Sequence, residues 1–180
     1  MLAALETNTV EEERHEFGMQ AQLLIADALR LQGNSLQARY EAEQVYQTAK
    51  ERDNKRFVSN ALRIFGLIAM NSGAMVQADE EFRQALTIAQ EIDDRYAQAA
   101  ALGNIGLIYQ RMGDFRQAIA NFEQALEGAR EIEHQRLQAL NLNNLGTAHE
   151  NMSDYPGAMK YYRQAYSVAE EDNDMPLMGT

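Results

Sequence analysis

Apolar side chains recur along the chain in steps of three and four residues, with polar side chains between them. This spacing places the apolar residues on one face of an α-helix, because about 3.6 residues complete a helical turn. Two consecutive stretches show it well, the first with Leu102, Ile105 and Tyr109 and the second with Ala118, Phe122, Ala125 and Ala129. The pattern therefore predicts a pair of amphipathic helices here.

The same pattern returns every 40 residues along the chain. Small residues and bulky rings keep their places at this offset: Gly66, Gly106 and Gly146, and Phe82, Phe122 and Tyr162. The first copy is the most divergent, since it has Ala26 and Ala42 at these two positions. A single helix pair cannot bury its apolar face alone, so successive pairs must stack.

We therefore predict an all-α solenoid of four antiparallel helix pairs that forms one domain over residues 1–180. The expected repeats are approximately 15–54, 55–94, 95–134 and 135–174. Residues 175–180 are expected to be a tail or the start of a truncated fifth repeat. Thr9 and Glu12 have the spacing of a capping box, which suggests an extension of the first helix.

Short polar turns separate the two halves of each repeat. Asn34, Asp114 and Asp154 are expected to cap the helix that follows, because a side-chain oxygen can accept from its free amides. Gln37 and Gln117 lie three residues after the first two and complete a capping-box pattern. Ala74 occupies the equivalent place in the second repeat and has no such oxygen, so that turn is expected to be weaker.

Composition narrows the classes of partner. The formal net charge is −11, and an acidic surface repels nucleic-acid phosphates and anionic lipids. We therefore expect no nucleic-acid and no membrane partner. The absence of cysteine excludes disulfides and thiolate chemistry and fits a cytoplasmic protein.

The sequence offers no recognisable chemistry. His15, His134 and His149 include no pair with the spacing of a helical metal site. No phosphate-binding glycine loop or nucleophile elbow is present, and acidic runs on helices are usually solvated faces. We expect no catalytic residues, no metal, no cofactor and no enzymatic activity.

The quoted residues resemble the tetratricopeptide repeat family. Leu102, Asn104-Ile105-Gly106, Tyr109, Gly113-Asp114-Phe115, Ala118, Phe122 and Ala125 follow the family pattern closely. The commonest repeat has about 34 residues. The longer form here is similar to the repeats of kinesin light chains, Pins-type scaffolds and bacterial signalling proteins. The resemblance implies a right-handed superhelix whose concave groove, lined by the first helix of each pair, holds a peptide or helix of a partner protein.

Carried over residue by residue, the resemblance implies a groove that begins with Gln20, Leu24 and Asp27 and contains the following positions: Arg30, Asn60, Arg63, Leu67, Asn71, Asn104, Leu107, Gln110, Arg111, Asn143, Asn144, Thr147 and Asn151. Side-chain amides can donate to and accept from a peptide backbone. Leu24 and Ile64 replace the asparagine of the later repeats, so we expect an apolar first half and an amide-rich second half. Arg63 and Arg111 are the best candidates to bind an acidic side chain or a terminal carboxylate.

Two functions remain open at this stage. One is a protein-interaction scaffold, either by itself or as the regulatory part of a larger signalling protein. The other is self-assembly into a homo-oligomer through the terminal repeats, where Met152, Met159, Met175 and Met178 are candidates for an interface.

Overall fold

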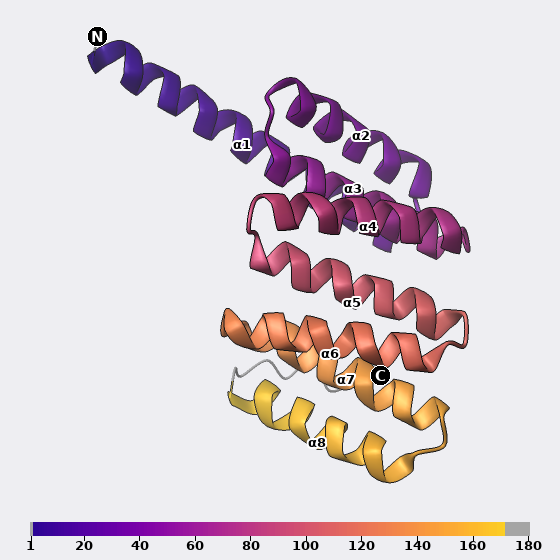
Figure 1. Ribbon diagram of the computed structural model, residues 1–180. Helices are drawn as coiled ribbons and strands as arrows, with labels where there is room; N and C mark the ends of the chain where they lie inside the picture. Colours follow the sequence, from indigo (N-terminus) through magenta and orange to yellow (C-terminus); the bar gives the residue numbers. More distant parts are fainter. Residues whose placement is uncertain (1, 172–180) are drawn as a thin grey trace.

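The computed structural model describes residues 2–171, with side chains from residue 11 to residue 170, and this part of the chain contains helices and no strand (Figure 1). The helices are α1 (Leu2–Leu31), α2 (Ser35–Glu51), α3 (Lys55–Asn71), α4 (Met75–Glu91), α5 (Arg95–Arg111), α6 (Phe115–Glu131), α7 (Gln135–Asn151) and α8 (Tyr155–Glu171). They form four antiparallel pairs stacked in chain order, which confirms the predicted all-α solenoid. Residues 175–180 lie outside the described residues.

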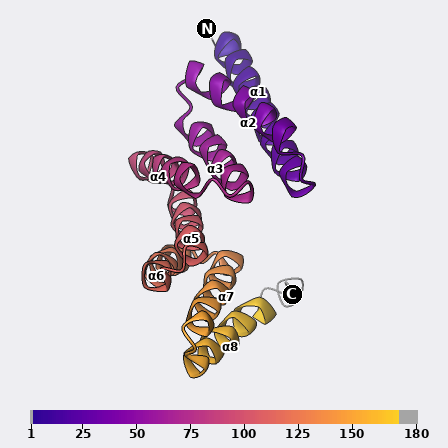
Figure 2. The ribbon, with the colours of Figure 1, turned by 90° about the vertical axis from the view of Figure 1, so that its right-hand side faces the viewer.

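The two helices of each pair have different surroundings. The first helices, α1, α3, α5 and α7, also touch one another along the stack. The second helices, α2, α4, α6 and α8, make little or no such contact among the described residues. Figure 2 shows α4 and α6 on the left side of the stack, with α3, α5 and α7 to their right. The odd-numbered helices therefore form the inner side of the curved array.

Glycines and rings hold each pair together. The ring of Phe122 in α6 lies directly on Gly106 in α5, where a Cβ atom would come within 2.5 Å of a ring carbon. Gly66 with Phe82, and Gly146 with Tyr162, repeat this arrangement. Phe82 and Phe122 are fully buried. The small residue lets the two helices approach, and the ring fills the space that remains between them.

Most of the predicted caps are present. The side-chain oxygens of Asn34, Asp114 and Asp154 accept from backbone N–H groups at distances of 3.4, 3.1 and 3.1 Å. The reciprocal half of the first capping box is not made, because Gln37 donates to Glu41 instead. The turns between repeats are also capped, and the sequence analysis missed the role of His134, whose Nδ1 accepts from the N–H of Leu137.

Ala74 provides a test of capping. Its backbone angles, φ −80° and ψ 66°, match those of the capping residue Asn34, yet it makes no side-chain bond to the helix it precedes. We expect Ala74→Asp to raise the free energy of unfolding by about 1 kcal/mol, because the new carboxylate would satisfy a free amide of α4. Asp114→Ala should lower it by a similar amount. Urea denaturation monitored by circular dichroism measures both changes, and a destabilised Ala74→Asp variant would contradict the argument.

The first helix extends upstream of the first repeat, as predicted. It begins at Leu2 and runs without a break through Thr9, so Thr9 does not start the helix. Its N-terminal part projects beyond the rest of the stack (Figure 1). Phe17, Leu24 and Ile25 on this helix are exposed.

Candidate functional site

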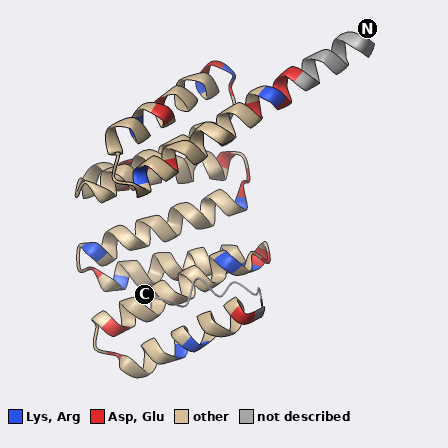
Figure 3. Ribbon diagram, turned by 180° about the vertical axis from the view of Figure 1, so that it is seen from behind, with Lys and Arg blue, Asp and Glu red and all other residues tan. Residues whose placement is uncertain are grey.

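The least buried faces of the odd-numbered helices lie along the inner side of the array. Buried residues fall on the other faces of α3, α5 and α7, where these helices pack against their even-numbered neighbours. The inner faces carry few charges. Seen from behind, α5 is uncharged between the arginines at its two ends (Figure 3). The part of the inner side that α5 contributes is thus an uncharged strip in a protein whose net charge is −11.

A pocket of about 460 Å³ opens between α1, α3 and the start of α5. Its lining combines apolar, amide and charged groups: Gln20, Leu23, Leu24, Asp27, Arg56, Asn60, Arg63, Asp94 and Tyr96. Gln20, Leu24, Asp27, Asn60 and Arg63 are positions predicted from the sequence, whereas Arg56, Asp94 and Tyr96 were not predicted. Asp94 and Tyr96 stand at the turn and first helical turn of the next repeat, a region that the groove pattern of the family does not cover.

The formal charges of the pocket balance, but three of its four charged residues already have partners. Arg56 pairs with Glu16 at 3.3 Å, and Asp27 pairs with Arg30 at 2.8 Å. Asp94 accepts a hydrogen bond from the N–H of Ala97 and caps α5. These contacts leave Arg63 as the charged group of the pocket that is available to a ligand.

Arg63 is partly buried and makes no hydrogen bond or ion pair with another described residue. Burial lowers the pKa of its guanidinium, and the nearby Asp27 carboxylate works against that shift. A buried cation without a partner is costly to the fold, and a carboxylate would offset that cost with two parallel hydrogen bonds. The Arg63 guanidinium can therefore bind an acidic group without first breaking an ion pair within the chain.

The other predicted arginines are engaged within the chain. Arg30 forms its ion pair with Asp27. Arg111 is exposed, but its Nη1 donates to the backbone oxygen of Met70 at 2.9 Å and so ties α5 to α3. The structure thus separates the two arginines that the sequence treats as equivalent: Arg63 is unpaired and Arg111 has a structural partner.

Amides are the main polar groups farther along the inner side. The side chains of Asn60, Asn104, Asn143 and Asn144 make no hydrogen bond with other described residues, and neither does exposed Asn71. Asn151 instead donates to the backbone oxygen of Thr147, and Thr147 to that of Asn143. The free amides of α5 and α7 are the groups that could pair with the backbone of a bound chain.

The apolar side chains predicted to line the groove are more buried than expected. Leu67 and Leu107 are half-buried and pack against the core clusters of adjacent repeats. Ile64 is completely buried, so the expected apolar first half is wrong at this position, and only Leu24 of the two substituted sites is exposed. The side-chain oxygen of Gln110 is buried without a partner.

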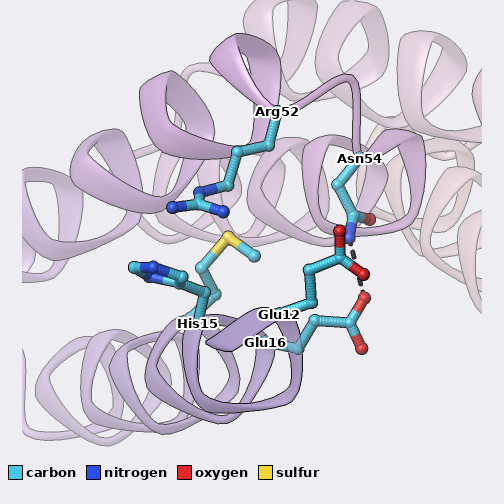
Figure 4. Close-up of a pocket in the computed structure, with 6 residues that line it drawn as sticks. Glu12, His15, Glu16, Arg52 and Asn54 are labelled. Atoms are coloured by element: carbon cyan, nitrogen blue, oxygen red, sulfur yellow. Dashed lines mark hydrogen bonds between the residues drawn. The ribbon is translucent and has the colours of Figure 1, made fainter. Parts of the chain in front are cut away.

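A second pocket, of about 370 Å³, lies between α1 and the turn that joins α2 to α3 (Figure 4). Arg52 and His15 occupy one side of it, and Glu16 and Asn54 the other. The Glu16 carboxylate accepts from Asn54 at 2.9 Å and from Arg56 at 3.3 Å. We interpret this pocket as part of the junction between the first two repeats, because Glu16 on α1 binds both the turn before α3 and α3 itself.

The described part of the chain contains no cluster of three or more His, Asp or Glu side chains that could hold a metal ion. No helix in this part combines the length and apolar character needed to cross a membrane.

Comparison with protein families gives one match. The family described as tetratricopeptide repeat matches residues 57–131 and 99–171, which together span more than half of the chain. No curated protein sequence matches this chain.

Solved structures share the fold at low sequence identity. BtubC (BKLC) from P. vanneervenii is 18% identical with a TM-score of 0.72, and the alignment covers 86% of this chain and 64% of that protein. The apo form of RapI is 17% identical with a TM-score of 0.76, covering 96% and 65%. Aspartyl phosphate phosphatase F from Bacillus subtilis is 15% identical with a TM-score of 0.82, covering 89% and 42%. This chain thus spans less than two thirds of the length of each of these proteins.

Proposed function

Because the chain belongs to the tetratricopeptide repeat family, we propose that it is a protein-interaction scaffold, without enzymatic activity, that holds a segment of a partner protein along the inner faces of α1, α3, α5 and α7. Solenoids of stacked helix pairs create extended concave surfaces suited to this task.

The observation that carries the proposal is the unpaired Arg63 in the pocket between α1, α3 and α5. An acidic side chain or terminal carboxylate of the partner would enter this pocket and bind Arg63 bidentately. Exposed Leu24, beside it, would contact an apolar neighbour of the acidic residue.

The free amides continue the site beyond the pocket. Asn104 on α5 and Asn143 and Asn144 on α7 would pair with the partner backbone, which any sequence supplies. The partner would therefore be selected mainly at the α1–α3–α5 pocket and held less selectively along α5 and α7. A cytoplasmic location and a place in a larger signalling protein are consistent with this scaffold role.

Peptide selection tests the proposal. Random short peptides would be selected for binding to the purified chain, and the affinities of the selected peptides measured by fluorescence anisotropy. We expect an acidic residue at a fixed position in these peptides, and we expect Arg63→Ala to weaken binding by about tenfold, the loss typical of one well-placed charged contact. Binding should also weaken as salt is added.

Arg116→Ala is the matched control, because Arg116 is an exposed arginine on the even-numbered helix α6. Its affinity for the selected peptides should equal that of the unmodified chain. Circular dichroism would establish that both variants keep their helix content. Equal affinities of Arg63→Ala and the unmodified chain, or peptides without a shared acidic position, would refute the assignment of the pocket.

A further inference from the structure

One apolar contact joins each repeat to the next. In the first instance the ring of Tyr46 on α2 packs against the ring of Phe65 on α3, with 5.8 Å between their centroids. The equivalent residues 40 and 80 positions later share apolar clusters: Leu86 packs against the cluster that contains Ile105, and Leu126 lies in one cluster with Leu145. The contact always uses the second helix of one repeat and the first helix of the next.

The N-terminal end of the stack carries one half of this contact without its partner. Ile25 on α1 stands at the position of Phe65, and it is 52% exposed where Phe65 is 4% exposed. Phe17 likewise stands at the position of the buried Phe57 and is exposed. Within the described part of the chain, no other helix covers these two side chains.

The C-terminal end carries the other half. Tyr166 on α8 stands at the position of Leu126, and it is 44% exposed where Leu126 is 5% exposed. Met159 is exposed on the same helix. At the position of Tyr166, α8 therefore has an aromatic side chain where α2, α4 and α6 have the aromatic or apolar side chain that covers the next repeat.

We propose that the two open ends cover each other in different copies of this chain, with α8 of one copy packed on α1 of the next and Tyr166 against Ile25. Both surfaces belong to this chain, and the interface that would join them continues one that the fold already forms three times, between α2 and α3, α4 and α5, and α6 and α7. Two copies would thus associate through the same kind of interface that already joins successive repeats.

Such a contact is heterologous, because two different surfaces of the same chain meet. Unless the rotation closes a ring, it adds copies in a row rather than ending at a dimer. The net charge of −11 on each copy opposes their approach, so added salt should promote the association by screening that repulsion.

Two variants, each with one end blocked, test the proposal. Ile25→Glu places a charge on the N-terminal surface, and Tyr166→Glu places one on the C-terminal surface. Multi-angle light scattering of the unmodified chain should show a mass that rises with protein concentration and with salt. Either variant alone should stay monomeric, since growth in a row needs both ends. An equimolar mixture should give a dimer of one copy of each variant that grows no further, because one intact end remains on each.

Val76→Glu is the matched control, because Val76 is exposed on α4, away from both ends. It should assemble as the unmodified chain does, and circular dichroism should show unchanged helix content in all three variants. If Ile25→Glu loses helix content, Phe17→Glu replaces it on the same surface. A chain that stays monomeric at every concentration overturns the proposal, whether its ends are free or covered by another segment of the chain. A dimer formed by either variant alone also overturns it, because like ends would then be pairing.

Discussion

Replacement of Phe122 by alanine is expected to lower the free energy of unfolding by about 3–5 kcal/mol, the range for removing a large buried ring. The ring is fully buried between α5, α6 and α7, in a cluster with Leu142 and Leu145. The neighbouring glycine, Gly106, has no side chain that could move into the space left behind. The loss therefore combines removal of apolar contacts with an unfilled cavity.

Urea denaturation would measure this loss, and hydrogen exchange would locate it. Since each repeat contacts only its neighbours, protection should fall first in α5 to α8. Phe17→Ala is the matched control: it removes the same ring from an exposed site and should change stability by less than about 0.5 kcal/mol under monomeric conditions. A similar small effect of Phe122→Ala would mean that the ring does not support the core.

The second large effect is expected from a single added methyl group. Gly106→Ala would place a Cβ atom 2.5 Å from the Phe122 ring, which is far inside van der Waals contact. Alanine should favour the helix by about 1 kcal/mol relative to glycine. The clash should outweigh this gain, because the ring is enclosed and α5 and α6 would have to move apart, leaving a net loss of about 2 kcal/mol.

Gly18→Ala separates the two effects. Gly18 also lies inside a helix, but an added Cβ atom would meet nothing within 4 Å, so this variant should be stabilised. Combining Gly106→Ala with Phe122→Leu should recover part of the loss, since the smaller side chain makes room for the methyl group. Additive losses in the double variant would show that the glycine and the ring are not in direct conflict.

Much of the fold follows from the sequence because the repeat imposes it. The constant 40-residue offset places Gly66, Gly106 and Gly146 opposite their rings without any knowledge of the structure. In three of the four turns within the repeats, the capping residue can be recognised in the sequence because it is Asn or Asp. Local chemistry and long-range packing agree at these positions, which is why both could be predicted.

The site is less predictable, because the role of a side chain depends on what the neighbouring repeats place beside it. Arg63 and Arg111 look alike in the sequence, but Arg111 meets the backbone oxygen of Met70, 41 residues away, and Arg63 meets no such group. Every residue has a backbone oxygen, so the sequence does not show which of them a side chain will meet. Ile64 occupies a groove position by register, but it is fully buried in the core cluster that α1, α2 and α3 share.

The separation of the even-numbered helices has a mechanical consequence. The odd-numbered helices touch along the inner side of the stack, whereas the even-numbered helices are held to it mainly through their own neighbours. Arg39 of α2 approaches Glu81 of α4 only to 3.8 Å, which makes a weak brace. Bending the stack about its inner line would change the gaps between even-numbered helices, keep the contacts within each helix pair, and load the contacts that join α2 to α3, α4 to α5 and α6 to α7. Changes of curvature should therefore concentrate at these three junctions, and a ligand that spans several odd-numbered helices would resist them.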